Sequence, residues 1–145
     1  PSWSQREGFP NGVPAEAAEN LIKATMTNRQ DLIASLGTGF QAKEGNISKN
    51  MERWLERINL DASPYATTES IKSLRDLDLR PNLSKIKIPV AIFHGVQDKS
   101  CPFIWAEELQ KGIKNAVLIR FEKSGHVLFL EEMEKFNMEL EKFAK

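Results

Sequence analysis

Two predicted strands separated by one predicted helix lie near the end of the chain, and this order constrains the fold more than any other sequence feature. The expected elements are a strand at residues 89–93, a helix at about 102–111, a strand at 116–121 and a helix at about 128–143. The first run is continuous and apolar and ends at His94 and Gly95, which is typical of a strand buried on both faces. Strands joined through a helix are parallel with a right-handed crossover, so both end on the same side of the sheet. We therefore expect an α/β fold.

Residues 1–80 carry helical patterns and almost nothing that reads as a strand. The expected helices lie at residues 14–27, at 28–36, after an N-cap at Ser48, and from Ser63 and Pro64 onward. Gly37, Thr38 and Gly39 are expected to end the second helix. Apolar side chains recur at helical spacing, and we expect them to face inward. They are Leu21, Ile22, Met26, Met51, Trp54, Leu55, Ile58, Ile71, Leu74 and Leu77, with Phe129, Met133, Phe136, Leu140 and Phe143 in the last helix.

Charge and cysteine content exclude several classes of protein. Twenty basic and twenty acidic residues leave no net positive field, so neither nucleic acid nor an anionic membrane is an expected partner. A single cysteine, Cys101, forms no intrachain disulfide, which favours a reducing compartment. No apolar run reaches the roughly 18 residues of a membrane helix, and no signal peptide is evident. We expect a cytoplasmic chain, and the start at Pro1 fits either removal of an initiator or a start within a longer sequence.

Asp98 follows the first predicted strand and His126 follows the second. Ligands of open α/β sheets bind beyond the carboxyl ends of the strands, where both residues would lie. There a carboxylate can accept the Nδ1 proton of an imidazole and fix its tautomer, while Nε2 takes a proton from a nucleophile or water. Gly95 and Gly125 suit the sharp turns that this placement requires. The alternative is an aspartate in a surface turn and a histidine in a loop, with no shared task.

These residues carry a resemblance to a known family. The motifs are the run Leu83-Ser84-Lys85-Ile86-Lys87-Ile88-Pro89-Val90-Ala91-Ile92-Phe93-His94-Gly95-Val96-Gln97-Asp98 followed by Pro102, and Ser124-Gly125-His126 before a helix with Glu131, Phe136 and Asn137. They resemble the C-terminal portion of an α/β-hydrolase. The resemblance implies that Asp98 is the acid of a catalytic triad and His126 the general base. It also implies that residues 1–80 are the family's helical lid, and residues 81–145 the C-terminal βαβα part of the catalytic domain with the last two parallel strands.

A narrower resemblance covers nearly the whole chain. The matching segments are Phe9-Pro10-Asn11-Gly12-Val13-Pro14, Asn28-Arg29, Trp54, Thr67-Thr68-Glu69-Ser70 and Asp78-Leu79-Arg80. They are similar to the branch of haloperoxidases and esterases that work without a cofactor. This similarity implies a serine-type hydrolase that acts on a small-molecule ester or related acyl substrate, with a haloperoxidase or perhydrolase side-activity.

The sequence departs from the family in one large respect, because it has no Gly-x-Ser-x-Gly nucleophile motif. Ser35 and Ser124 lack the flanking glycines, and the strands that precede the lid in the family are also missing. A two-stranded sheet leaves an apolar edge unpaired. We therefore expect a C-terminal half that is inactive alone and pairs with the N-terminal half of the hydrolase or with a second copy of this chain. The alternative is a truncated, catalytically inactive fragment that folds by dimerising.

Other residues allow further hypotheses. Cys101 could act as a thiol nucleophile, but it precedes Pro102 rather than lying on an elbow, so a small packed residue is the better interpretation. His94, Asp98 and His126 have the residue types of a metal site, although a histidine at a strand end is more often hydrogen-bonded, and we expect no metal. Three tryptophans either line an acyl pocket under the lid or, as we expect, fill the core or an interface. They are Trp3, Trp54 and Trp105.

Overall fold

The sheet lies in the C-terminal part of the chain, in a computed structural model that describes residues 2–145. Its strands, β1 (Ala91–Gly95) and β2 (Val117–Phe121), are parallel as predicted, with Ile92 opposite Leu118. β1 begins later than predicted and includes His94 and Gly95, because these two residues still pair with β2. β1 is less buried than predicted, since Ile92 and Gly95 are buried and its other three residues are half-buried.

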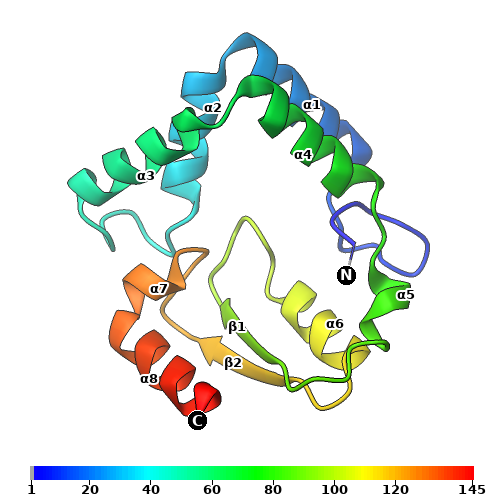
Figure 1. Cartoon of the computed structure of the whole chain (residues 1–145). Helices are drawn as coiled ribbons and strands as arrows, with labels where there is room; N and C mark the ends of the chain where they lie inside the picture. The colour runs from blue at the N-terminus through cyan, green and yellow to red at the C-terminus, as the bar shows by residue number, and fades with distance from the viewer. Residues whose placement is uncertain (1) are drawn as a thin grey trace.

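One helix covers each face of this sheet (Figure 1). α6 (Ile104–Gly112) packs on one face and buries Trp105 and Ala106. α8 (Met133–Ala144) lies on the other face, where the ring centroid of Phe136 is 5.4 Å from that of Phe93 and 6.3 Å from that of Phe121. Phe121 is fully buried. A small aromatic core therefore fixes α8 against both strands.

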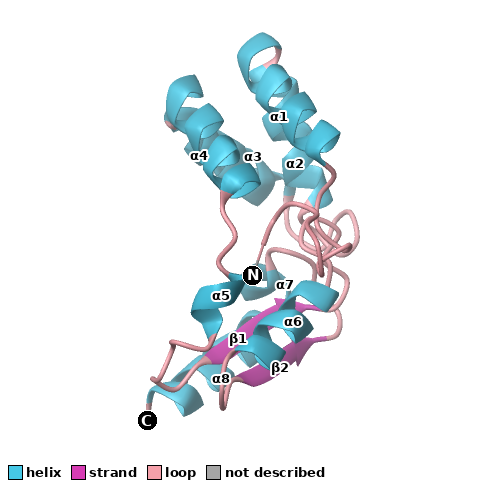
Figure 2. Cartoon of the chain, turned by 90° about the vertical axis from the view of Figure 1, so that its right-hand side faces the viewer, coloured by secondary structure: helices cyan, strands magenta, loops and turns pink. Residues whose placement is uncertain are grey.

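The N-terminal helices form a separate layer at the other end of the molecule from the sheet (Figure 2). They are α1 (Ala15–Thr27), α2 (Arg29–Gly39), α3 (Lys49–Asp61) and α4 (Pro64–Asp76), and the short α5 (Arg80–Leu83) leads from them to the sheet. α1 packs against α4, and α2 packs against α3. Ser48 caps α3 as predicted, because its Oγ accepts from the backbone N–H of Met51 at 3.2 Å. None of the helices within residues 2–145 has the length and apolar character needed to cross a bilayer.

One predicted helix end is wrong, and one helix predicted as continuous is divided in two. α2 continues through Gly37 and Thr38 to Gly39, because glycine can remain helical and the next residue, Phe40, is held by contacts outside the helix. The last predicted helix is two helices, α7 (Leu128–Glu131) and α8, separated at Glu132 with φ −127° and ψ 51°. At this break, the neighbouring Glu131 and Glu132 both contact the loop before His126.

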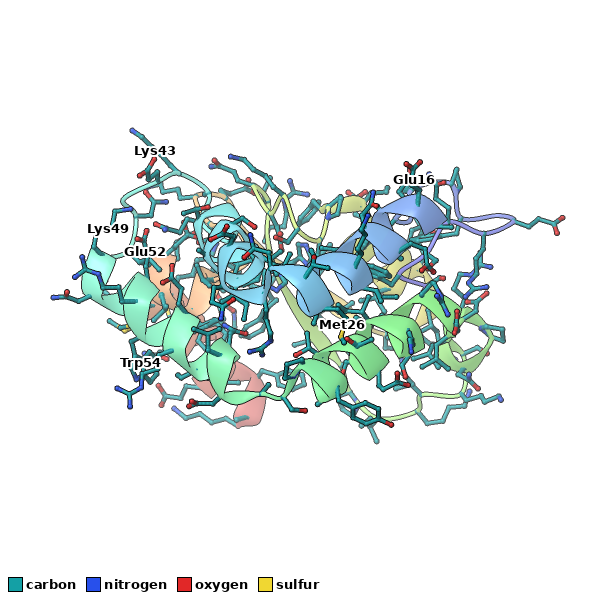
Figure 3. The ribbon with its side chains drawn as sticks, turned by 90° about the horizontal axis from the view of Figure 1, so that it is seen from above. Glu16, Met26, Lys43, Lys49, Glu52 and Trp54 are labelled. Atoms are coloured by element: carbon teal, nitrogen blue, oxygen red, sulfur yellow. The ribbon has the colours of Figure 1, made fainter. Side chains whose placement is uncertain are left out.

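Most of the predicted apolar faces are only partly covered. The exposed members are Met26, Trp54, Ile58, Leu74, Leu77, Phe129, Met133, Leu140 and Phe143. Figure 3 shows Trp54 on the side of α3 turned away from the loop that carries Lys43. The prediction that these side chains face a core is therefore wrong for this chain, since helical spacing defines an apolar face but not whether another element packs on it.

Candidate active site

Asp98 lies in the turn that follows β1, where its carboxylate is held from two sides. Its Oδ1 accepts hydrogen bonds from the backbone N–H groups of Ser100 and Cys101, both at 2.8 Å. Its Oδ2 lies 2.8 Å from Nδ1 of His126. The Asp98 side chain is only 3% exposed and the His126 side chain 41%. The buried carboxylate is thus fully engaged, and Nε2 of the imidazole remains as the nitrogen that can serve a ligand.

The loop that carries His126 fits tightly against the end of β1. The backbone N–H of Gln97 donates to the carbonyl of Ser124 at 3.0 Å. A Cβ on Gly95 would lie 2.1 Å from the carbonyl oxygen of Gly125, so no larger residue fits at position 95 without movement. The two predicted turn glycines are therefore required by close approach of backbone to backbone, and neither has a positive φ.

The ion pair shifts the pKa of each partner in the direction that favours its charged form. The hydrogen bond to Asp98, supported by the nearby Cys101 side chain, raises the pKa of His126 to about 10. Burial by itself would raise the pKa of Asp98, but the hydrogen bonds from His126 and from the Cys101 backbone outweigh it, so this pKa lies below its usual value. The carboxylate is therefore suited to stabilise an imidazolium.

His126 borders a mostly apolar cavity of about 560 Å³ between the helical layer and the ends of the strands. The wall comes from α1, α2 and α4, and the floor from the turn after β1 together with His126. The lining includes Leu21, Leu32, Ile33, Leu36, Phe40, Ile71, Leu74, Ser100 and Cys101. A volume of this size holds a small organic group, and its surface favours an apolar one.

The structure confirms the preferred interpretation of His94 as a hydrogen-bonded residue, and it differs from the interpretation of Cys101 as a packed one. Nε2 of His94 is 2.8 Å from the carbonyl oxygen of Cys101, so His94 is a hydrogen-bonded residue. Cys101 is half-buried at the cavity wall rather than packed in the core. Within residues 2–145, the His, Cys and acidic side chains close enough to share a metal are Asp98, Cys101 and His126. Nε2 of His94 lies 3.8 Å from Oδ2 of Asp98, but His94 is not part of this cluster, and both Asp98 oxygens already make hydrogen bonds.

The three tryptophans have three different environments. Trp105 is buried and its Nε1–H donates to the carbonyl of Asn11 at 2.8 Å, so it fills the core as expected. Trp3 borders the cavity. Trp54 is 56% exposed and does neither.

Sequence reasoning missed the contact of the site with the loop between α2 and α3. The ring of Phe40 lies with its centroid 4.9 Å from that of His126. The Phe40 carbonyl accepts from the backbone N–H of His126 at 2.7 Å. These residues are far apart in the chain, and no local pattern signals such a contact.

A parallel strand pair that brings an aspartate and a histidine together beneath a helical layer defines the C-terminal portion of an α/β-hydrolase. Known proteins agree, and the chain belongs to the α/β-hydrolase superfamily. It is 38% identical over 144 residues to the AB hydrolase superfamily protein YisY of Bacillus subtilis, a match that covers 99% of this chain and 53% of that protein. It is 28% identical over 150 residues to the non-heme haloperoxidase of Rhodococcus erythropolis, covering 100% of this chain and 55% of that protein.

Solved structures give the same result. The esterase from Exiguobacterium antarcticum matches with a TM-score of 0.93 and 37% identity, over 98% of this chain and 52% of that one. A bromoperoxidase from Bacillus anthracis shares the fold, also with a TM-score of 0.93. No family model matches the chain. The chain spans about half the length of the curated relatives it matches and corresponds to their C-terminal portion.

Proposed function

We propose that this chain supplies the acid, the general base and the lid of a serine-type hydrolase whose nucleophile lies on a segment outside it. The observation that carries the proposal is the 2.8 Å contact of Asp98 Oδ2 with His126 Nδ1 at the floor of an apolar cavity. In this proposal Asp98 and His126 are the catalytic pair, residues 1–80 are the lid, and residues 81–145 belong to the catalytic domain.

The proposed reaction is acyl transfer. Nε2 of His126 takes the proton of a serine hydroxyl as the serine oxygen attacks an ester carbonyl, and Asp98 stabilises the resulting imidazolium. His126 then gives that proton to the leaving alcohol, and an acyl-enzyme forms. Water, or hydrogen peroxide in a perhydrolase side-activity, next attacks the acyl-enzyme with His126 again as base.

The cavity supports an ester or related acyl substrate with a small apolar group. Its lining includes seven Leu, Ile and Phe side chains beside polar ones such as Arg29 and Asn59, and we expect an apolar group of the substrate to bind against the seven. Relatives of the chain include a bifunctional esterase/perhydrolase of Acinetobacter calcoaceticus and several pimeloyl-[acyl-carrier protein] methyl ester esterases. Their names support ester chemistry for this site.

The open edge of β1 supports a partner that adds a strand. Val117 donates to the Val90 carbonyl and Val96 donates to the Phe121 carbonyl, both at 2.9 Å, so alternate residues of β1 bond to β2. Ala91 and Phe93 between them therefore direct their backbone groups toward the other edge. We propose that the N-terminal half of the hydrolase pairs there, because the matched relatives are about twice the length of this chain.

Complementation tests the proposal. The 145-residue chain alone is expected to show no hydrolysis of activated acetate esters above background. The esterase from Exiguobacterium antarcticum matches this chain over about half of its length. Mixing or co-expressing this chain with the other, N-terminal half of that esterase is expected to give hydrolysis that a serine-directed phosphonate abolishes. The matched control carries alanine in place of the nucleophilic serine of that half. Stable binding of the half without any hydrolysis would contradict the proposed catalytic role and favour an inactive fragment.

A further inference from the structure

Glu131 joins two loops that are distant in the sequence. Its Oε2 accepts from the backbone N–H of Gly125 at 2.6 Å, directly before His126. Its Oε1 accepts from the backbone N–H of Ala42 at 2.8 Å and from Nδ2 of Asn46 at 2.7 Å, both in the loop between α2 and α3. One carboxylate thus satisfies three N–H donors, two of them on backbones that the sheet and the helices leave unpaired.

The break at Glu132 makes this arrangement accessible. Neighbouring residues of a continuous helix point about 100° apart, whereas here the carboxylates of Glu131 and Glu132 both reach the segment 123–125. Here α7 ends at Glu131, and Oε2 of Glu132 accepts from the backbone N–H of Lys123 at 3.0 Å and from the Ser124 hydroxyl at 2.6 Å. The loop before His126 is therefore braced by two consecutive glutamates, of which only Glu131 also contacts the helical layer.

The helical side of this junction is itself anchored. Gln41 is almost fully buried, and its side chain bonds both the Glu52 carboxylate of α3 and the backbone N–H of Ile47. Figure 3 shows Glu52 near Lys49 at the start of α3, beside the loop that carries Lys43. Ala42, the residue after Gln41, therefore lies in a segment that is hydrogen-bonded to α3.

We propose that Glu131 is a positioning residue for His126. Glu131 connects the loop at Gly125 to the loop at Ala42, and this connection holds the imidazole of His126 in its orientation toward Asp98. Its importance for turnover rests on the proposed function, but the geometric claim does not. Glu131 acts through the backbone of Gly125 and does not touch the ring.

Glu131→Gln is the sharpest variant, because it keeps the size of the side chain and replaces one acceptor oxygen with an N–H donor. Whichever way the amide turns, it sets a donor against the N–H of Gly125 or of Ala42. Glu134→Gln is the matched control, since Glu134 is an exposed glutamate in the first turn of α8. The readouts on the 145-residue chain are the NMR signals of the His126 ring, with its hydrogen-bonded Nδ1 proton, and the exchange rates of the amides of residues 125 and 42.

In Glu131→Gln, the Nδ1 proton signal is expected to broaden or vanish, and both amides are expected to exchange about 10-fold faster or more. Glu134→Gln is expected to match the unmodified chain. Faster amide exchange with an unchanged ring signal would overturn the proposal, because Glu131 would then hold the loops together without orienting His126. Unchanged exchange rates of both amides together with an unchanged ring signal would overturn the proposal as well.

Asn46→Ala decides the matter if Glu131→Gln does not fold. Asn46 is exposed, and its loss removes one of the three donors to Glu131 while leaving the carboxylate in place. The Nδ1 proton of His126 is expected to exchange with solvent about twofold faster or more in this variant, and an unchanged rate would contradict the proposal. These measurements need no nucleophile, so they remain decisive even if complementation gives no hydrolase.

Discussion

The backbone N–H of His126 donates to the carbonyl oxygen of Phe40 at 2.7 Å, and the two rings lie 4.9 Å apart between centroids. The helical layer and the candidate base are therefore joined by main chain as well as by side chains. A change in the position of the loop between α2 and α3 would move the imidazole directly.

Gly125→Ala is expected to destabilise the chain by about 1–3 kcal/mol, because the added methyl group overpacks a closed junction. Its Cβ would lie 2.6 Å from the Phe40 carbonyl oxygen and 2.7 Å from the Ala42 nitrogen. Gly39→Ala is the control, since nothing lies within 4 Å of its Cβ position at the end of α2. That variant is expected to be neutral or to gain up to about 1 kcal/mol. Urea unfolding at equilibrium measures both, and equal losses would contradict the close contact at Gly125.

Stability is expected to fall as pH rises above the ordinary imidazole range. The pKa of His126 is raised from 6.5 to about 10, chiefly by the hydrogen bond to Asp98. The contribution of the ion pair to the free energy of unfolding is therefore fully present below about pH 6.5 and is lost as pH rises toward 10. Denaturant unfolding measured from about pH 6 to 10 should show this slope. His126→Gln should flatten it, and an identical slope in both proteins would place its origin elsewhere. Exposure of the ring reduces the size of the effect.

Asp98→Asn is expected to leave the fold intact and to lower turnover of the complemented enzyme by roughly 10⁴. The introduced side-chain amide would present a donor to Nδ1 and hold the wrong tautomer of His126, while its oxygen could still accept from the backbone of Ser100 and Cys101. Cys101→Ala is the comparison and should change the rate little, because those contacts use the Cys101 backbone. A loss of activity in Cys101→Ala, with Asp98→Asn active, would move the nucleophile to the thiol.

Binding of the N-terminal half is expected to slow amide exchange at Ala91 and Phe93 by about 10-fold or more, because these amides face the open edge of β1. The amides of Ile92 and His94 serve as internal controls, since they face β2 and are protected already. Equal slowing at all four positions would indicate general stabilisation rather than strand pairing. If the chain alone protects Ala91 and Phe93 in a concentration-dependent way, a second copy occupies the edge instead.

Local signals in the sequence determined the order of elements, the parallel crossover and the placement of Asp98 and His126 in neighbouring loops. Apolar runs, helix caps and strand-end glycines act over a few residues, so they can be identified without knowledge of the fold. The same signals overestimated burial at Trp54 and Met26, because periodicity marks an apolar face but not the element that covers it.

Tertiary structure alone decided how the site is held. The contacts of Glu131 with Ala42 and Gly125, and of Phe40 with His126, join segments that are far apart in the chain. The break at Glu132 accompanies these contacts, although the local sequence favours one continuous helix. Hydrogen bonds to buried backbone groups outweigh modest helix propensities, and such bonds exist only after the helical layer and the sheet have come together.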